Sequence, residues 1–285
     1  MLPTILRCSF GGYPPACTKN TKIMIFGIPR YLSVVGVKPS INPTCLLRLY
    51  SYEIEDYSGV FGIYYSDIPA CDIGDIHSIS FSAIDTDITT VIHHCIRREM
   101  RPLIMGGEHT FTYFIVREIK PKTLIVFDAH LDLRDTYYGD SFNHATFMRR
   151  AVEHGYAREI YFVGARAFSK EEREYVDENK HLRIIDDVRN FVEYEFQEPI
   201  YVSIDLDVLD PCYMTLVSSP EPLGLSPQDI LAAMKHLSKY DILGLDIMEF
   251  TPYTLDMSSI SLATKIVFEG AATLWQSIKA RLSEH

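Results

Sequence analysis

LIVFDAHLD, at residues 124–132, is the stretch that decides the fold of this chain. It opens with four apolar residues, which is typical of a buried β-strand, and it ends in Asp128, His130 and Asp132. A strand without polar positions is buried on both faces, which is typical of a parallel sheet covered by helices. In such open sheets, ligands bind at the carboxyl ends of the strands. The segment therefore predicts a parallel α/β fold with a polar site where this strand ends.

Three more apolar runs end in acidic or histidine residues in the same way. They read LIMGGEHT (103–110), YVSIDLDVLDP (201–211) and ILGLDIMEFTP (242–252). Because the carboxyl ends of parallel strands meet at one edge of a sheet, we expect the polar residues of all four runs to lie together. Asp and His at a strand end are also common as turn formers or helix caps, so each motif alone has a purely structural alternative. Four of them together favour a shared site.

The rest of the chain alternates between strand and helix patterns. Strand-like runs lie near 22–27, 102–106, 123–128, 159–164, 182–186, 200–205 and 242–247. Helical periodicity is found near 85–100, 110–119, 144–155, 170–179, 227–239 and 258–282. This alternation predicts a three-layer α/β/α architecture with a mainly parallel central sheet. Because no repeat or flexible linker interrupts it, we expect residues 1–285 to form a single domain.

The spacing of the polar residues indicates a metal site. Those of DAHLD lie at positions i, i+2 and i+4, so they share one face while the chain stays extended. Asp205 and Asp207 repeat this spacing, and His109 follows a Gly106-Gly107 pair that lets the backbone bend sharply. Four carboxylates and two imidazoles are too negative to be buried without cations. Two divalent ions would balance the four carboxylates.

The ligand types indicate which ions and which chemistry to expect. Oxygen and nitrogen donors without thiolate suit Mn²⁺ or Mg²⁺-like ions, with Zn²⁺, Co²⁺ or Fe²⁺ as alternatives. Two ions about 3.5–4 Å apart would share a bridging water and lower its pKa, which gives a hydroxide nucleophile at neutral pH. The residues alone therefore predict a binuclear metallohydrolase.

The segments GGEHT, DAHLD, SIDLDVLDP and DIMEFTP resemble the four signature segments of the ureohydrolase (arginase–agmatinase) family. Weaker echoes are FGIPR, NPTCLLR and DIGDI, so the resemblance extends from Gly27 to about Pro252. It implies an arginase-like fold and two Mn²⁺ per chain. By this resemblance His109, Asp128, Asp132 and Asp205 hold one manganese, and Asp128, His130, Asp205 and Asp207 hold the other.

The region after DAHLD is most similar to that of prokaryotic agmatinases. It reads LRDTYYGDSFNHATFMRR (133–150), in which His144 matches the family histidine near the substrate. The alternative for His144 is a residue at the start of the following helix. Agmatine has no carboxylate, and no Arg or Lys that would clamp one is obvious here. The resemblance therefore favours the hydrolysis of agmatine to putrescine and urea, a step of polyamine biosynthesis.

Glu249 matches the family glutamate that pairs with the guanidinium of the substrate. A carboxylate at the end of a hydrophobic strand is costly to bury unless it is paired, and a planar guanidinium can pair with it through two hydrogen bonds. A local cap or salt bridge is the alternative for Glu249, and Asp246 on the same run is expected to be structural. Proton transfer would fall to Asp207 or His144.

Residues 212–225, CYMTLVSSPEPLGL, depart from the family pattern. Leu216, Val217 and Ser218 stand where Gly-Thr-Gly is expected. The loss of two glycines restricts the backbone and places apolar bulk beside the expected rim of the active site. The metal ligands are untouched, so we expect hydrolysis to be retained.

Composition and charge are those of an intracellular enzyme. The chain of 285 residues carries a net charge of −11, which argues against a nucleic-acid partner and suits a small cationic guanidino substrate. The six cysteines show no spacing of a zinc ribbon or a disulfide framework, and neither a signal peptide nor a membrane-spanning run is visible. We expect a reduced, cytoplasmic protein that does not bind membranes. The resemblance also implies homo-oligomers, as a trimer or hexamer.

Three other functions stay open at this point. Another ureohydrolase, acting on aminopropylagmatine, guanidinobutyrate or arginine, would share every metal residue and differ at the rim. A deacetylase-like relative would use one metal ion instead of two. The altered residues 216–218 also leave open a non-catalytic metal-binding homologue. Metal content and urea release distinguish these three.

Overall fold

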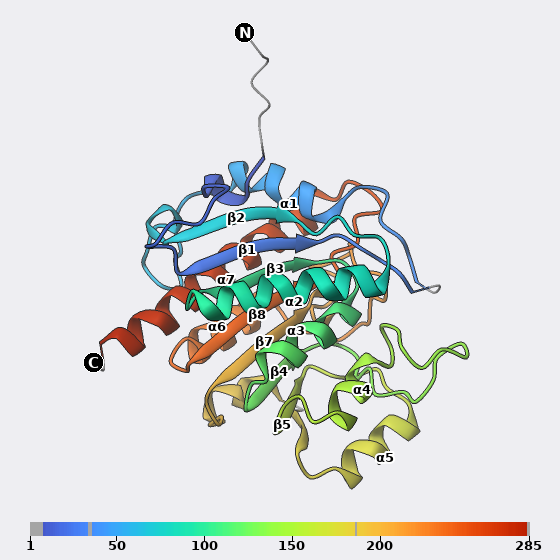
Figure 1. Cartoon of the computed structure of the whole chain (residues 1–285). Coiled ribbons are helices and arrows are strands. Elements are labelled where there is room, and N and C mark those ends of the chain that lie inside the picture. The colour runs from blue at the N-terminus through green and yellow to red at the C-terminus, as the bar shows by residue number, and fades with distance from the viewer. Residues whose placement is uncertain (1–7, 34–35, 186, 284–285) are drawn as a thin grey trace.

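The described residues of the computed structural model, 8–33, 36–185 and 187–283, form a central parallel sheet of eight strands (Figure 1). The strands are β1 (Ile23–Ile28), β2 (Ala70–Asp75), β3 (Arg101–Gly106), β4 (Thr123–Phe127), β5 (Glu159–Val163), β6 (Leu182–Ile185), β7 (Ile200–Asp205) and β8 (Ile242–Met248). They follow the order β2-β1-β3-β8-β7-β4-β5-β6, and every neighbouring pair is parallel. The predicted fold class is therefore confirmed.

Helices cover both faces of this sheet. They are α1 (Pro43–Tyr50), α2 (Phe81–Arg97), α3 (Thr112–Ile119), α4 (Phe147–Glu153), α5 (Lys170–Glu178), α6 (Pro227–Leu237) and α7 (Met257–Leu282). Apolar residues of α1, α6 and α7 form one core with strand residues such as Ile25 and Ile125. Helices α2 to α5 form the other core with residues such as Phe26 and Val126. Because successive strand residues point to opposite faces, strands with apolar residues at both parities fill both cores.

Two elements near the N-terminus were not predicted. Strand β2 lies at the edge of the sheet, and its Asp72 and Gly74 are typical of a turn rather than a strand. Helix α1 is short and begins at Pro43, after Asn42, whose side chain accepts the amide hydrogen of Cys45. Neither element has the long apolar pattern that marks the other strands and helices.

The C-terminal helix begins one residue earlier than the predicted range 258–282, at Met257. Helix α7 is capped by Asp256, which accepts the amide hydrogen of Ser258. Residue 186 of the predicted strand 182–186 lies outside the described residues, as do residues 1–7 and 284–285 of the predicted domain. Within the part of the chain that is described, no helix has the length and apolar character needed to cross a membrane.

A disulfide joins Cys17 to Cys71, with Cα atoms 5.2 Å apart. The expectation of a fully reduced chain without a disulfide is therefore wrong in this structure. The two cysteines are separated by 54 residues, and no sequence spacing marks them as a pair. Cys8, Cys45, Cys95 and Cys212 are free thiols.

The four strands that precede the polar motifs are consecutive in the sheet, in the order β3-β8-β7-β4. Their ends are level, because Phe127 pairs with Ile204 and Ile204 pairs with Ile247. The next residues, Asp128 and Asp205, therefore emerge side by side at the carboxyl edge of the sheet. The topology thus gathers the predicted site at one place.

Candidate metal centre

A tight turn at the end of β4 shapes the DAHLD motif. The strand ends at Phe127, and Oδ1 of Asp128 accepts the amide hydrogen of His130 at 2.7 Å. Asp132 has a left-handed φ of 54°. These residues therefore do not share one face of an extended strand, as their spacing predicted. The turn brings them together instead.

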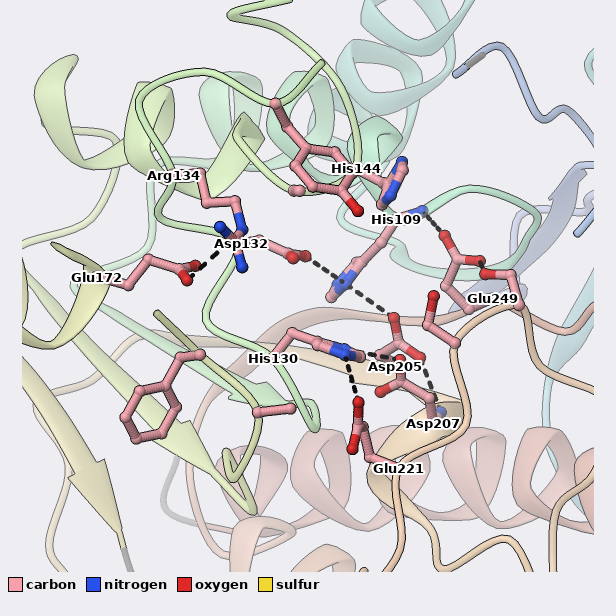
Figure 2. Close-up of a pocket in the computed structure, with 16 residues that line it drawn as sticks. His109, His130, Asp132, Arg134, His144, Glu172, Asp205, Asp207, Glu221 and Glu249 are labelled. Atoms are coloured by element: carbon pink, nitrogen blue, oxygen red, sulfur yellow. Dashed lines mark hydrogen bonds and ion pairs between the residues drawn. The ribbon is translucent and has the colours of Figure 1, made fainter. Parts of the chain in front are cut away.

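Three carboxylates surround the imidazole of His109, and Figure 2 shows two of them, those of Asp132 and Asp205. Its Nδ1 lies 3.0 Å from Oδ2 of Asp128, 3.3 Å from Oδ2 of Asp205 and 3.7 Å from Oδ2 of Asp132. All four side chains are buried. These are the residues that the family resemblance assigns to one manganese.

A second group forms around His130. Its Nδ1 lies 3.0 Å from Oδ2 of Asp207 and 3.5 Å from Oδ1 of Asp128. Asp128 therefore faces both imidazoles, one with each oxygen. Two groups have possible ligand atoms within 4.8 Å of one another, namely His109, Asp128 and Asp205, and Asp128, His130 and Asp207. Asp205, which the resemblance also assigns to the second ion, belongs only to the first of these groups.

The hydrogen bond at Nε2 orients His109 as in a metal ligand. Ser203 Oγ donates to Oδ1 of Asp246 at 2.5 Å, so it accepts a hydrogen bond from Nε2 of His109, 2.8 Å away. The proton of the neutral ring is then on Nε2, and the lone pair of Nδ1 faces the carboxylates. Among the described residues, the buried Nδ1 has no hydrogen-bond partner. An imidazole oriented in this way through its other nitrogen is typical of a metal-binding histidine.

Burial and crowding shift the pKa values of the cluster. Burial, with the negative charges of Asp207 and Asp128, raises the pKa of Asp205 well above its ordinary value. Burial and Asp128 likewise raise the pKa of Asp132. Burial lowers the pKa of His109, but the neighbouring carboxylates outweigh it, so the net shift is upward. Without cations the cluster therefore retains protons, which divalent ions would displace.

Glu249 reaches the same cavity from the end of β8. It has a φ of 60°, and its Oε1 accepts the amide hydrogen of His109 at 2.8 Å. Its Oε2 accepts a hydrogen bond from Ser218 Oγ, also at 2.8 Å. Burial raises the pKa of Glu249 to about 7, although the His109 hydrogen bond opposes the shift. Asp246, on the same strand, is fully buried and accepts hydrogen bonds from neighbouring hydroxyls, as a structural residue does.

His144 also lines the cavity (Figure 2). It precedes the first residue of α4, Phe147, so it is not part of that helix. Its ring lies edge-on to Tyr137, with centroids 5.7 Å apart, and burial lowers its pKa. A neutral imidazole here can accept a proton from a group bound in the cavity.

The cavity, about 370 Å³ in volume, is lined by residues that the sequence did not reveal. These include Arg134, Tyr137, Phe168, Glu172 and Glu221. The guanidinium of Arg134 lies 3.7 Å from Glu172 and 5.4 Å from the ring centroid of Tyr137. No Arg or Lys clamp for a carboxylate is obvious in the sequence, but the structure places Arg134 in the lining of the cavity. The nearness of Arg134 to DAHLD in the sequence was the only signal for it.

Residues 216–218 lie differently from our expectation. Leu216 and Val217 are buried in the hydrophobic core, so they add no apolar bulk to the rim. None of the three residues has a positive φ, which explains why their side chains are tolerated where glycine is expected. Only Ser218 lines the cavity.

Comparisons with known proteins agree with this geometry. Residues 21–272 match the arginase family. The chain is 32% identical to an agmatinase of Pyrococcus horikoshii, with 90% of this chain and 93% of the relative covered. It is 34% identical to a mitochondrial arginase of Arabidopsis thaliana, with 71% and 66% covered. The solved agmatine ureohydrolase of Thermoplasma volcanium has a TM-score of 0.85 at 26% identity, with 100% of this chain and 98% of that chain covered. Relatives of similar identity thus bear different substrate names.

Proposed function

The chain belongs to the arginase family, and from this premise we propose that it is a ureohydrolase with two Mn²⁺ that converts agmatine to putrescine and urea. Its agmatinase relatives and structural neighbours support a hydrolase. The observation that carries the proposal is that Asp128 joins two His/Asp groups beside the cavity that Glu249 lines.

The donors present fit two divalent ions. His109, Asp128, Asp132 and Asp205 would hold one, and Asp128, His130, Asp205 and Asp207 the other. Carboxylate and imidazole donors without thiolate favour Mn²⁺. Two ions bound there would supply Lewis-acid activation of a water molecule for attack on the guanidinium carbon.

Protein side chains would orient the substrate and move its protons. Glu249 would bind the guanidinium through two hydrogen bonds and so fix its trigonal carbon beside the two His/Asp groups. His144, whose pKa is lowered by burial, would accept the proton released by the attacking water and pass it to the nitrogen of the C–N bond that breaks, with Asp207 as the alternative carrier. The amine and urea then leave.

Charge in the cavity supports a dicationic substrate such as agmatine. If two ions balance the four aspartates, the other charged residues of the lining are Glu172, Glu221, Glu249 and Arg134. The guanidinium would neutralise one of these glutamates, and a distal ammonium would neutralise a second. Aminopropylagmatine satisfies the same requirement with a longer chain.

A guanidino acid, such as arginine or guanidinobutyrate, is the second candidate, because Arg134 lines the cavity. In the described residues the Arg134 side chain contacts Glu172 and Tyr137 and makes no hydrogen bond. Its guanidinium could therefore bind a carboxylate. We place agmatine first because Glu172 already offsets the charge of Arg134.

Urea release from a panel of guanidino compounds tests the proposal. Protein purified with Mn²⁺ is expected to bind two ions per chain and to release urea fastest from agmatine, compared with aminopropylagmatine, guanidinobutyrate and arginine. One ion per chain would favour a deacetylase-like relative. Two ions without urea from any compound would favour a non-catalytic homologue.

Three further expectations accompany this proposal. Putrescine formation would place the enzyme in polyamine biosynthesis. A cytoplasmic location, without nucleic-acid or membrane partners, and a trimeric or hexameric assembly stay predictions. Light scattering of the purified protein tests the assembly.

A further inference from the structure

Ser218 is the only side chain among the described residues that donates a hydrogen bond to the carboxylate of Glu249. Its Oγ lies 2.8 Å from Oε2, while the amide nitrogen of His109 lies 2.8 Å from Oε1. Each oxygen of the carboxylate thus has one donor from the protein. We propose that Ser218 is a positioning residue that fixes the plane in which Glu249 binds the guanidinium, an inference that rests on the proposed function.

The number of acceptor sites on Glu249 supports this role. An ionised carboxylate offers about four lone-pair sites. Ser218 and His109 use two of them, one on each oxygen, and a guanidinium that binds through two hydrogen bonds needs the other two. Rotation about the last torsion of a glutamate side chain meets little resistance by itself. The second donor therefore matters, because one hydrogen bond alone leaves the carboxylate free to turn.

The chain before Ser218 fixes the position of its hydroxyl. Leu216 and Val217 are buried in the core, and the carbonyl oxygen of Leu216 accepts the amide hydrogen of Thr251 at 2.7 Å. Leu216 therefore faces Thr251. Ser218 lies two residues after Leu216, and it faces Glu249, which lies two residues before Thr251. Two hydrogen bonds, one at Leu216 and one at Ser218, therefore hold this loop against the segment that follows β8.

This arrangement gives a structural role to Leu216 and Ser218, which depart from the family pattern. The resemblance predicts glycine at positions 216 and 218, and glycine has neither a hydroxyl nor a side chain to bury. In this chain Leu216 anchors the loop and Ser218 supplies the donor. A side-chain donor to Glu249 at position 218 is thus not predicted by the resemblance.

Three variants test the proposal in the full-length protein loaded with Mn²⁺. Ser218→Ala removes the donor, and Ser218→Thr keeps a hydroxyl. Thr215→Val is the matched control, because it removes a hydroxyl of the same loop that donates to Asp256 at 2.8 Å and is not part of the cavity lining. Steady-state kinetics with agmatine, metal content and melting temperature are measured for each.

Ser218→Ala is expected to lose about tenfold in kcat/KM, as for a lost hydrogen bond to a charged group. The loss should fall mainly on kcat, because attack requires alignment more strictly than binding does. Ser218→Thr should recover most of the activity, Thr215→Val should keep the parent kcat/KM, and all variants should retain two ions.

Two results would overturn the inference while the proposed function stands. One is a Ser218→Ala variant with the parent kcat/KM. The other is an equal loss in Ser218→Ala and Thr215→Val with equally lowered melting temperatures, which is the behaviour of a merely structural hydroxyl. If the parent protein releases no urea from any guanidino compound, the proposed function fails and this inference fails with it.

Discussion

The backbone amide of His109 donates a hydrogen bond to the side chain of Glu249, which lies 140 residues further along the chain. His109 belongs to the first His/Asp group, so this bond fixes Glu249 in relation to any ions held there. The parallel neighbours β3 and β8 make the bond possible, because His109 follows β3 and Glu249 follows β8. The geometry between the metal centre and the guanidinium-binding carboxylate is therefore set by the sheet.

Changing Glu249 to Gln should leave both ions bound and lower kcat/KM more than tenfold. The amide keeps the size of the side chain but removes the charge that pairs with a buried guanidinium, a loss of about 2–5 kcal/mol. Metal analysis and steady-state kinetics measure the two effects separately. Glu174→Gln, on the exposed side of α5, is the control. Loss of metal in the Glu249 variant would place this residue among the ligands, and parent activity would make it structural.

Replacement of Asp128 by Ala should cost both ions, whereas replacement of His130 should cost one. Asp128 faces both imidazoles, and His130 belongs to a single group. Loss of a ligand also leaves the other buried carboxylates without compensation, so turnover should fall to almost nothing in both variants. Metal analysis of the purified proteins gives the count, with the exposed Asp135→Ala as control. Equal metal content in the Asp128 and His130 variants would contradict a shared role for Asp128.

The parts of the fold and site that could be predicted depend on local pattern. Strands such as β4 and β7 are mostly apolar runs with aspartates at or just after their ends, so their position and these polar residues were visible in the sequence. The edge strand β2 was missed because Asp72 and Gly74 weaken its pattern. The contact of Ser218 with Glu249 and the place of Arg134 in the cavity were missed for a different reason. Their roles depend on where loops lie in relation to residues far away in the sequence, and no spacing records that.

Metal-free protein should be less stable at pH 8.5 than at pH 5.5. The pKa of Glu249 is raised from 4.5 to about 7, so the folded state binds more protons than the unfolded state between these values, and the free energy of unfolding falls as the pH rises through them. The raised pKa values of His109 and Asp205 act in the same direction.

The melting temperature in the presence of a chelator should therefore drop by roughly 5 °C over this pH range. With saturating Mn²⁺ the melting temperature should instead rise with pH. Metal ions replace the protons that the cluster retains, so metal binding becomes tighter as the pH rises. Thermal unfolding at both pH values, with and without Mn²⁺, measures this. The same pH dependence in both conditions would show that the cluster does not exchange protons for metal.

Replacement of Arg134 by Met should shift the substrate preference towards dications. Among the described residues, Arg134 is the only Arg or Lys in the cavity lining, and it lies 3.7 Å from Glu172. Its loss therefore removes repulsion of a distal ammonium and removes a partner for a distal carboxylate. We expect kcat/KM for agmatine to rise a few-fold and that for guanidinobutyrate or arginine to fall about tenfold, as for a lost charge-assisted hydrogen bond. The ratio of the two kcat/KM values is the quantity to compare, because it cancels any general effect on folding or metal content. Arg97→Met, on the exposed surface of α2, should leave that ratio unchanged. An unchanged ratio in the Arg134 variant would show that the guanidinium serves only to hold Glu172, and substrate choice would then depend on Glu221 and the shape of the cavity.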